Sequence, residues 1–170
     1  MIIRPETESD HKAIEALTYL AFENHPHHEI GAKPTEHIIV NSLRENNALS
    51  LSLVAEDDTG IIGHIAFSSV TIGKKQCGWY GLGPVSVVPK HQGVGVGSKL
   101  ILAGLNILKT RNAMGAVLLG DPQYYGRFGF KSNTNLVLPD VPPEYFLALS
   151  FSTEKTSLTV GTVNYHSAFS

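Results

Sequence analysis

The clearest indication of function in the sequence is a glycine-rich turn at residues 89–100. Its sequence, PKHQGVGVGSKL, holds three alternating glycines, Gly93, Gly95 and Gly97, after an apolar run at residues 82–88 that is typical of a strand. The apolar residues that follow have helical spacing: Leu100, Ile101, Leu105 and Leu108. Glycines let an anion approach the main chain, and the unpaired N–H groups of a helix's first turn attract it. The turn therefore predicts a phosphate cradle.

The spacing of the glycines excludes two common nucleotide-binding motifs. A dinucleotide fingerprint, G-x-G-x-x-G, needs a glycine where this chain has Ser98 or Leu100. A P-loop ends in Gly-Lys-Ser/Thr, whereas Gly97 is followed by Ser98 and Lys99. The segment fits Gln/Arg-x-x-Gly-x-Gly/Ala, beginning at Gln92, and so resembles the pyrophosphate loop of the GNAT acyltransferases.

A second motif lies at residues 115–130. The short apolar run GAVLLG has the pattern of a buried strand, and DPQYYGRFGF follows it. Tyr125 precedes the pair Gly129 and Phe130 by four residues, which resembles the GNAT signature whose Tyr faces the sulfur of coenzyme A. Both motifs occur in the order of the family, and their wording resembles most the small bacterial subgroup called YhbS-like. The resemblance extends from residue 3 to residue 151.

This resemblance implies an N-acetyltransferase that uses acetyl-CoA (coenzyme A). The diphosphate is expected at the main-chain N–H groups of the loop, and the pantetheine arm along the strand at residues 82–88. Pro84 cannot donate to a strand ladder, so it favours an edge or a bulge there. Gln92 is expected to shape the loop. The implied cofactor-binding residues are Val85, Val87, Gln92, Gly93, Val94, Gly95, Val96, Gly97 and Ser98.

Tyr125 is the predicted catalytic residue. By resemblance, a neutral amine attacks the thioester directly, a backbone N–H stabilises the tetrahedral intermediate, and Tyr125 protonates the departing thiolate. A phenol with an ordinary pKa of about 10 keeps its proton at neutral pH and can still give it to a thiolate. The alternative is that Tyr125 only packs in the core. Its neighbour Tyr124 is expected to point elsewhere on the helix and is the less favoured acid.

The general base and the acceptor contacts are less sharply defined. Residues 81–84 hold no carboxylate where some GNAT enzymes place a glutamate. His64 and Glu23 are the candidates for the general base. The alternative for His64 is a structural core histidine, and that for Glu23 is a solvated carboxylate at the end of a helix. A relay of ordered water molecules would need neither residue. Trp79 and Tyr80 either line the acceptor pocket or pack in the core.

The run His25-Pro26-His27-His28 is not predicted to bind a metal. Three histidines within four residues do not easily converge on one ion, and neither a cysteine nor a second histidine pair completes a tetrahedral set. By resemblance, this loop is expected to form a wall of the acceptor pocket.

Composition suits one domain over residues 1–170. The 170 residues are 42% hydrophobic, and 13 basic and 15 acidic residues give a net charge of −2, so neither nucleic acid nor a membrane is expected as a partner. No signal core is present, and the single Cys77 agrees with a cytoplasmic location. The expected partner is a small-molecule or protein amine as acceptor. A homodimer is left open, as are two other functions, a non-catalytic acyl-CoA-binding or sensing module and a nucleotide-binding domain.

Periodicity predicts two helices after a first strand, an antiparallel middle and a βαβ end, which is the GNAT order of elements. The resemblance therefore implies an α/β (α+β) fold with a mixed central sheet flanked by helices. Residues 7–10 resemble a helix start, and a second helix is expected after Pro34. The residues expected to face inward are Ala13, Ile14, Leu17, Leu20 and Ala21 on the first helix, and Ile38, Ile39 and Leu43 on the second. Strands are expected at residues 51–55, 61–72, 82–88 and 145–151, with a hairpin near residues 73–75 and a helix at about residues 98–112.

Overall fold

The centre of the molecule is a mixed sheet. The computed structural model describes residues 1–23, 25–26, 28–152 and 159–170. Its strands are β1 (Ile2–Pro5), β2 (Leu49–Asp57), β3 (Gly60–Ile72), β4 (Lys75–Val87), β5 (Gly115–Leu119), β6 (Lys131–Ser132), β7 (Leu136–Val137), β8 (Phe146–Ser150) and β9 (Gly161–Asn164). Their order is β1-β2-β3-β4-β5-β8-β6, and β9 pairs with both β3 and β7. The pairs β4–β5 and β7–β9 are parallel, and the others are antiparallel.

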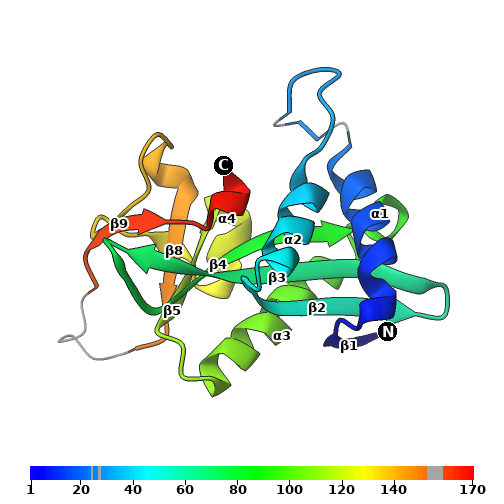
Figure 1. The fold of residues 1–170 in the computed structure, drawn as a ribbon, viewed down its shortest axis with the longest axis horizontal. Helices are drawn as coiled ribbons and strands as arrows, with labels where there is room; N and C mark the ends of the chain where they lie inside the picture. Colours follow the sequence, from blue (N-terminus) through cyan, green and yellow to red (C-terminus); the bar gives the residue numbers. More distant parts are fainter. Residues whose placement is uncertain (24, 27, 153–158) are drawn as a thin grey trace.

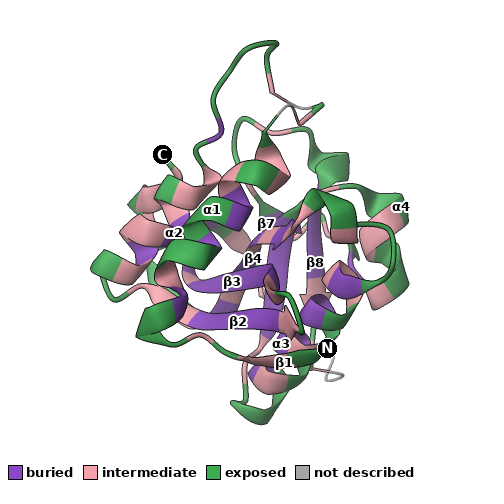
Figure 2. Ribbon diagram, turned by 90° about the vertical axis from the view of Figure 1, so that its right-hand side faces the viewer, coloured by how far each residue is buried: buried purple, intermediate pink, exposed green. Residues whose placement is uncertain are grey.

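Helices cover both faces of this sheet, which confirms the predicted fold class. The α-helices are α1 (His11–Phe22), α2 (Glu36–Glu45), α3 (Val96–Thr110) and α4 (Pro122–Tyr125), and the 3-10 helices are η1 (Glu8–Asp10), η2 (Pro89–His91), η3 (Gly126–Phe128), η4 (Pro143–Tyr145) and η5 (Ser167–Phe169). Figure 1 shows α1 and α2 side by side across β3 and β4, with η5 beside α2. Buried residues concentrate on β2, β3, β4 and β8 (Figure 2). No helix in the described part of the chain is long and apolar enough to cross a membrane.

The start of α1 follows from its sequence. The backbone N–H and the hydroxyl of Thr7 both donate to Asp10 Oδ2, at 2.7 and 3.0 Å, and Arg4 makes a bidentate ion pair with the same carboxylate. Such reciprocal contacts satisfy donors that a helix start leaves unpaired, so residues 7–10 begin the helix as predicted.

The inward faces of α1 and α2 differ in part from those predicted. On α1 the buried residues are Ile14, Leu17 and Thr18, whereas Ala13 and Leu20 are exposed. On α2, Val40 and Leu43 are buried, and Ile38 is 56% exposed. A helix turns about 100° per residue, so residues two apart, such as Ile38 and Val40, cannot face the same core. The prediction that Ala13, Leu20 and Ile38 face inward is therefore wrong.

Helix α3 packs on the opposite face of the sheet from α1. A Cβ on Gly63 would meet Leu100 and Val96 of α3 at 3.0 Å, so the following residue of β3, His64, points to the α1 face. Gly104 lets the Phe67 ring approach the helix so closely that a Cβ would collide with it. The helix begins at Val96, two residues before the predicted start.

Strand β4 is longer than residues 82–88, because its ladder with β3 continues back to Lys75 through glycines that interrupt the apolar pattern. Ile65 pairs with Val85 and Phe67 pairs with Leu82, so β4 carries one extra residue between Leu82 and Val85. This irregularity is the bulge that Pro84 predicts.

Strand β5 pairs with β4 only over Trp79–Gly81, and no pairing with β5 is found beyond Gly81 in the described ladder. The strands therefore separate, and the β4 edge from Leu82 to Val87 faces an opening.

Candidate functional site

The glycine-rich loop between β4 and α3 presents an open main-chain surface. Gly93 and Gly95 have φ values of +78° and +91°, a left-handed conformation that favours glycine. A Cβ added at either position would meet nothing within 4 Å. At Gly97 the nearest atom is Tyr124 Oη at 3.5 Å. The loop has its shape because of glycine, and the space above it is free for a ligand.

The beginning of α3 supplies the donors for an anion. Gly95 is its N-cap residue, and no side chain caps the helix there. The N–H groups of Val96, Gly97 and Ser98 lie in the first turn, where a helix provides no intrahelical acceptor. The positive end of the helix dipole adds to their attraction for negative charge. The Gln92 side-chain amide fixes the loop to the strand end by donating to the Val87 carbonyl at 2.9 Å.

A cavity of about 460 Å³ lies over this loop. Every predicted cofactor-binding residue except Val94 lines it, and Val94 is 73% exposed. The open β4 edge at Val85 and Val87 forms one wall. A phosphate group fits the loop, because Cβ atoms at Gly95 and Gly97 would occupy the surface it needs, and an extended amide-containing arm fits the strand edge.

Arg127 lines the same cavity and was not among the predicted site residues. Its guanidinium lies over the Tyr124 ring at 4.4 Å, and its Nε donates to the Tyr124 carbonyl at 3.2 Å. A cation beside an anion cradle is the signal that could have identified it, since arginine suits phosphate groups. His91 and Phe22 also line this cavity.

Tyr125 stands at the end of α4, a short helix that Asp121 caps by accepting a hydrogen bond from the Gln123 N–H at 2.9 Å. Gly120 lets the Tyr125 ring lie directly against the end of β5, and Phe130 contacts the ring edge to face. Burial raises the pKa of Tyr125 to about 12. The phenol is therefore protonated at neutral pH, as an acid must be.

Tyr124 occupies a neighbouring position on the same wall. Its ring is perpendicular to that of Tyr125, with centroids 4.9 Å apart, and its hydroxyl lies 3.4 Å from Ser98 Oγ on α3. Both tyrosines line the cavity over the loop, so the prediction that Tyr124 points elsewhere is wrong: the short α4 places the two rings on one wall.

A second and larger cavity, of about 950 Å³, adjoins the first. The two share five lining residues: Phe22, His25, Val85, Tyr124 and Tyr125. The second cavity continues between α2, the β4 bulge, the loop at residues 138–141 and the end of the chain. The tyrosines and Val85 therefore stand where a ligand on the loop would meet a ligand in the second cavity.

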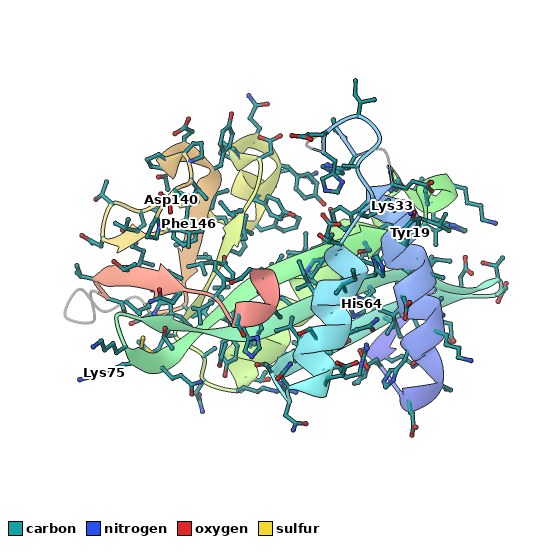
Figure 3. All side chains as sticks on the ribbon, turned by 45° about the horizontal axis from the view of Figure 1, so that its top comes forward. Tyr19, Lys33, His64, Lys75, Asp140 and Phe146 are labelled. Carbon is teal, nitrogen blue, oxygen red and sulfur yellow. The ribbon has the colours of Figure 1, made fainter. Side chains whose placement is uncertain are left out.

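His64 does not line either cavity. It is fully buried between the strands and the helices α1 and α2 (Figure 3), where its Nε2 lies 2.8 Å from Ser52 Oγ. Ser52 in turn donates a short hydrogen bond to Glu6, which forms a bidentate ion pair with Arg44. Burial lowers the pKa of His64 to about 4, so the ring is neutral. Its contact with an acceptor stays a prediction.

The other predicted acceptor contacts also lie outside the lining of the second cavity. Glu23 is exposed at the C-cap of α1. Trp79 is buried in the cluster of Val70, Val117 and Phe146, and its Nε1 donates to Thr159 at 3.3 Å. Tyr80 is half-buried against the main core. The core packing of Trp79 and Tyr80 corresponds to the alternative left open for them, and their acceptor roles stay predictions.

The loop after α1 contributes His25 to the second cavity, and the start of α2 contributes Glu36. His25 lines both cavities, and Glu36 lines the second and accepts a hydrogen bond from His28 Nε2 at 2.9 Å. His27 lies outside the described residues. Among the residues that the structure does describe, no group of three His, Cys, Asp or Glu could hold a metal ion.

The sequence and the fold both match known proteins. Residues 2–132 match the family model of the acetyltransferase (GNAT) domain. The chain is 38% identical to the uncharacterized N-acetyltransferase YhbS of Escherichia coli (strain K12) over 132 residues, 77% of this chain and 74% of that protein. It is also similar to the crystal structure of a GNAT family acetyltransferase from Brucella melitensis in complex with acetyl-CoA, at 45% identity and a TM-score of 0.85, over 99% of this chain and 97% of that one. The crystal structure of Escherichia coli YhbS in complex with CoA gives 33% identity and a TM-score of 0.88, over 99% and 91% of the chains. Because the family model matches residues 2–132 and these relatives share 33–45% of their residues with it over most of its length, the chain belongs to the GNAT acetyltransferase family.

Proposed function

We propose that this protein transfers an acetyl group from acetyl-CoA to a primary amine. The observation that carries the proposal is the junction of the two cavities at Val85, Tyr124 and Tyr125. One cavity has the donors for a diphosphate, and the other has the space for an acceptor. The two ligands would meet beside an open strand edge and a protonated phenol, which is the arrangement that direct acyl transfer needs.

Acetyl-CoA, when bound, supplies the activated acyl group as a thioester. The N–H groups of Val96, Gly97 and Ser98 hold its diphosphate, and Arg127 adds a positive charge beside it. Main-chain groups near Val85 and Val87 hold the pantetheine arm along the unpaired edge of β4. The bulge turns this edge toward the second cavity, so that a backbone N–H there can stabilise the developing oxyanion.

The neutral amine forms a new C–N bond to the acyl carbon as the C–S bond breaks. Tyr125 donates its phenolic proton to the departing sulfur and is reprotonated from the surroundings, and the proton lost by the amine leaves through a base or solvent. His64 and Glu23 stay candidates for that base, although neither lines the cavity. Glu36 and Asp121 are the carboxylates that do line it.

The decisive experiment combines binding with turnover. Isothermal titration should give saturable binding of acetyl-CoA and CoA, and much weaker binding of ATP and NAD. Thiol release in the presence of an amine library, with mass spectrometry of the products, should show acetylated amine and free CoA in equal amounts. Binding without amine-dependent thiol release would instead indicate a binding or sensing module.

The remaining parts of the proposal concern the acceptor and the assembly. The acceptor is a small-molecule amine or a protein amine, and residues 1–170 act as one domain, since the sheet path runs from β1 to β6 without a break. A homodimer stays a prediction, which light scattering at several protein concentrations tests.

A further inference from the structure

We call the second cavity, of about 950 Å³, the acceptor cavity, and the first, over the glycine-rich loop, the cofactor cavity. Apart from the residues they share, their walls come from different parts of the chain. The loop and α4 lie inside the segment that matches the family, which ends at residue 132. Much of the acceptor cavity is built by the loop at residues 138–141 and by residues 163–170, beyond that segment. Residues beyond the segment that matches the family model therefore contribute to the choice of acceptor, together with residues inside it.

Side chains with large apolar surfaces provide most of these walls. They come from α2, β5, the loop at 138–141, β9 and η5: Ile39, Leu119, Leu138, Val141, Val163 and Phe169. Tyr165 anchors the last segment, because its ring lies 2.5 Å from the position of a Cβ on Gly81 and contacts the Phe169 ring at 5.2 Å. Figure 1 shows η5 beside α2. Residues 163–166, 169 and 170 line this side of the cavity.

The cavity walls carry carboxylates and no lysine or arginine among the described lining residues. The carboxylates are those of Glu36 and Asp121. His166 also lines the cavity, and its Nδ1 accepts a hydrogen bond from the Ala168 N–H at 3.0 Å. An acceptor with a carboxylate beside its amine would bring a negative charge into an apolar space with no fixed cation to pair with it.

We infer that the acceptor is a primary amine on an apolar body, without a carboxylate near the amine, such as an aralkyl or medium-chain alkyl amine. Two carboxylates at the walls attract its ammonium form from solution, and the apolar walls bind its body. A cavity of about 950 Å³ has room for such a body and lies within the usual size range of small-molecule sites. This inference rests on the proposed acetyl transfer and names its substrate class.

Matched amines test the inference in the wild-type protein. With saturating acetyl-CoA, kcat/KM for 2-phenylethylamine should exceed that for phenylalanine, which differs by one carboxylate, by about 100-fold or more. From propylamine to hexylamine, kcat/KM should rise about 3-fold to 4-fold with each methylene. Spermidine and a lysine-containing peptide complete the panel as polar competitors.

A pair of variants tests the location. Leu138→Arg puts a cation on the cavity wall, whereas Val137→Arg changes the neighbouring residue, which is 51% exposed and does not line the cavity. Leu138→Arg should lower kcat/KM for 2-phenylethylamine about 10-fold and reduce its preference over phenylalanine, and Val137→Arg should behave like the wild type. Acetyl-CoA affinity reports whether each variant is folded, and if Leu138→Arg is not, the wild-type panel alone decides.

The outcomes separate this inference from the proposed function. Equal use of phenylalanine, or preference for spermidine or the peptide, with active acetyl transfer overturns the acceptor class and leaves the transferase standing. Saturable acetyl-CoA binding without transfer to any amine overturns the proposed function, and the inference with it.

Discussion

The Tyr125 ring lies against Gly120 so closely that a Cβ on Gly120 would overlap the ring. Gly120 directly follows β5 and Tyr125 ends α4, so this contact fixes the ring between the end of the strand and the core residue Phe130. The absence of a side chain at Gly120 thus determines where the phenol of the proposed acid stands.

Gly120→Ala should therefore displace Tyr125. Because the φ of Gly120 is not left-handed, the alanine has no backbone penalty, and the effect comes from overlap with the ring. Overpacking of this kind costs about 1–3 kcal/mol in the free energy of unfolding, and kcat should fall as the hydroxyl moves. Denaturant unfolding and steady-state kinetics measure the two effects. Gly126→Ala is the matched control, since a Cβ there meets nothing within 4 Å, and equal behaviour of the two variants would contradict the prediction.

Tyr125→Phe should lower the rate of acyl transfer by roughly 100-fold, because it removes the proton but keeps the ring and its packing. Acetyl-CoA affinity should change little. Tyr124→Phe is the control and should have a much smaller effect. The acyl-transfer step must be measured by rapid mixing, since slow release of CoA could hide its loss in kcat. Unchanged transfer rates in Tyr125→Phe would assign leaving-group protonation to solvent or another side chain.

Gly97→Asp should nearly abolish acetyl-CoA binding while the protein stays folded. The position accepts a Cβ, whose nearest neighbour would be 3.5 Å away, but a carboxylate there faces the expected diphosphate. Gly97→Asn has the same size without the charge, so it separates electrostatic from steric loss. Titration calorimetry should show at least a further 10-fold loss for aspartate over asparagine. Equal affinities of the two variants would argue against an anion at this position.

Acid should destabilise the protein through His64 well before the carboxylates titrate. Burial lowers the pKa of His64 from about 6.5 to about 4, so below pH 6.5 the unfolded chain binds a proton that the folded protein refuses. Stability is retained above pH 6.5 and falls as the pH drops toward 4, by about 2 kcal/mol between pH 7.5 and pH 5.

His64→Gln removes this titration and should flatten the slope of stability against pH in that interval. Burial alone would raise the pKa values of Glu6 and Asp10, but hydrogen bonds from Arg44 and Arg4 outweigh it and lower both. The stability that these two carboxylates contribute is therefore lost only as the pH falls below about 4.5. Denaturant unfolding at several pH values gives the slope for each protein. The same slope in the variant and the wild type would show that His64 is not the group responsible.

Local spacing in the sequence determined the parts of the site that we propose to bind the cofactor and to protonate its thiolate. Three features depend only on neighbours in the chain: helix capping at Thr7 and Asp10, the glycines of the loop, and the position of Tyr125 four residues before Gly129. They can therefore be predicted from the sequence without knowledge of the fold. The core was predicted less completely. Helices α1 and α2 each carry more apolar residues than one helix face can bury. Ile14 and Val40 lie on the faces that pack against the sheet, whereas Leu20 and Ile38 are exposed.

Only the tertiary structure decided the acceptor side. His64 has the chemistry of a base, but the burial that holds it against Ser52 depends on α1 and α2 packing across β3. The acceptor cavity joins Glu36, Pro84, Tyr125, Leu138 and Phe169, which are far apart in the sequence. No periodicity relates such residues, because what brings them together is the separation of β4 from β5 and the return of the chain's last segment over α2. Those are non-local contacts, fixed by packing and strand pairing rather than by any local pattern.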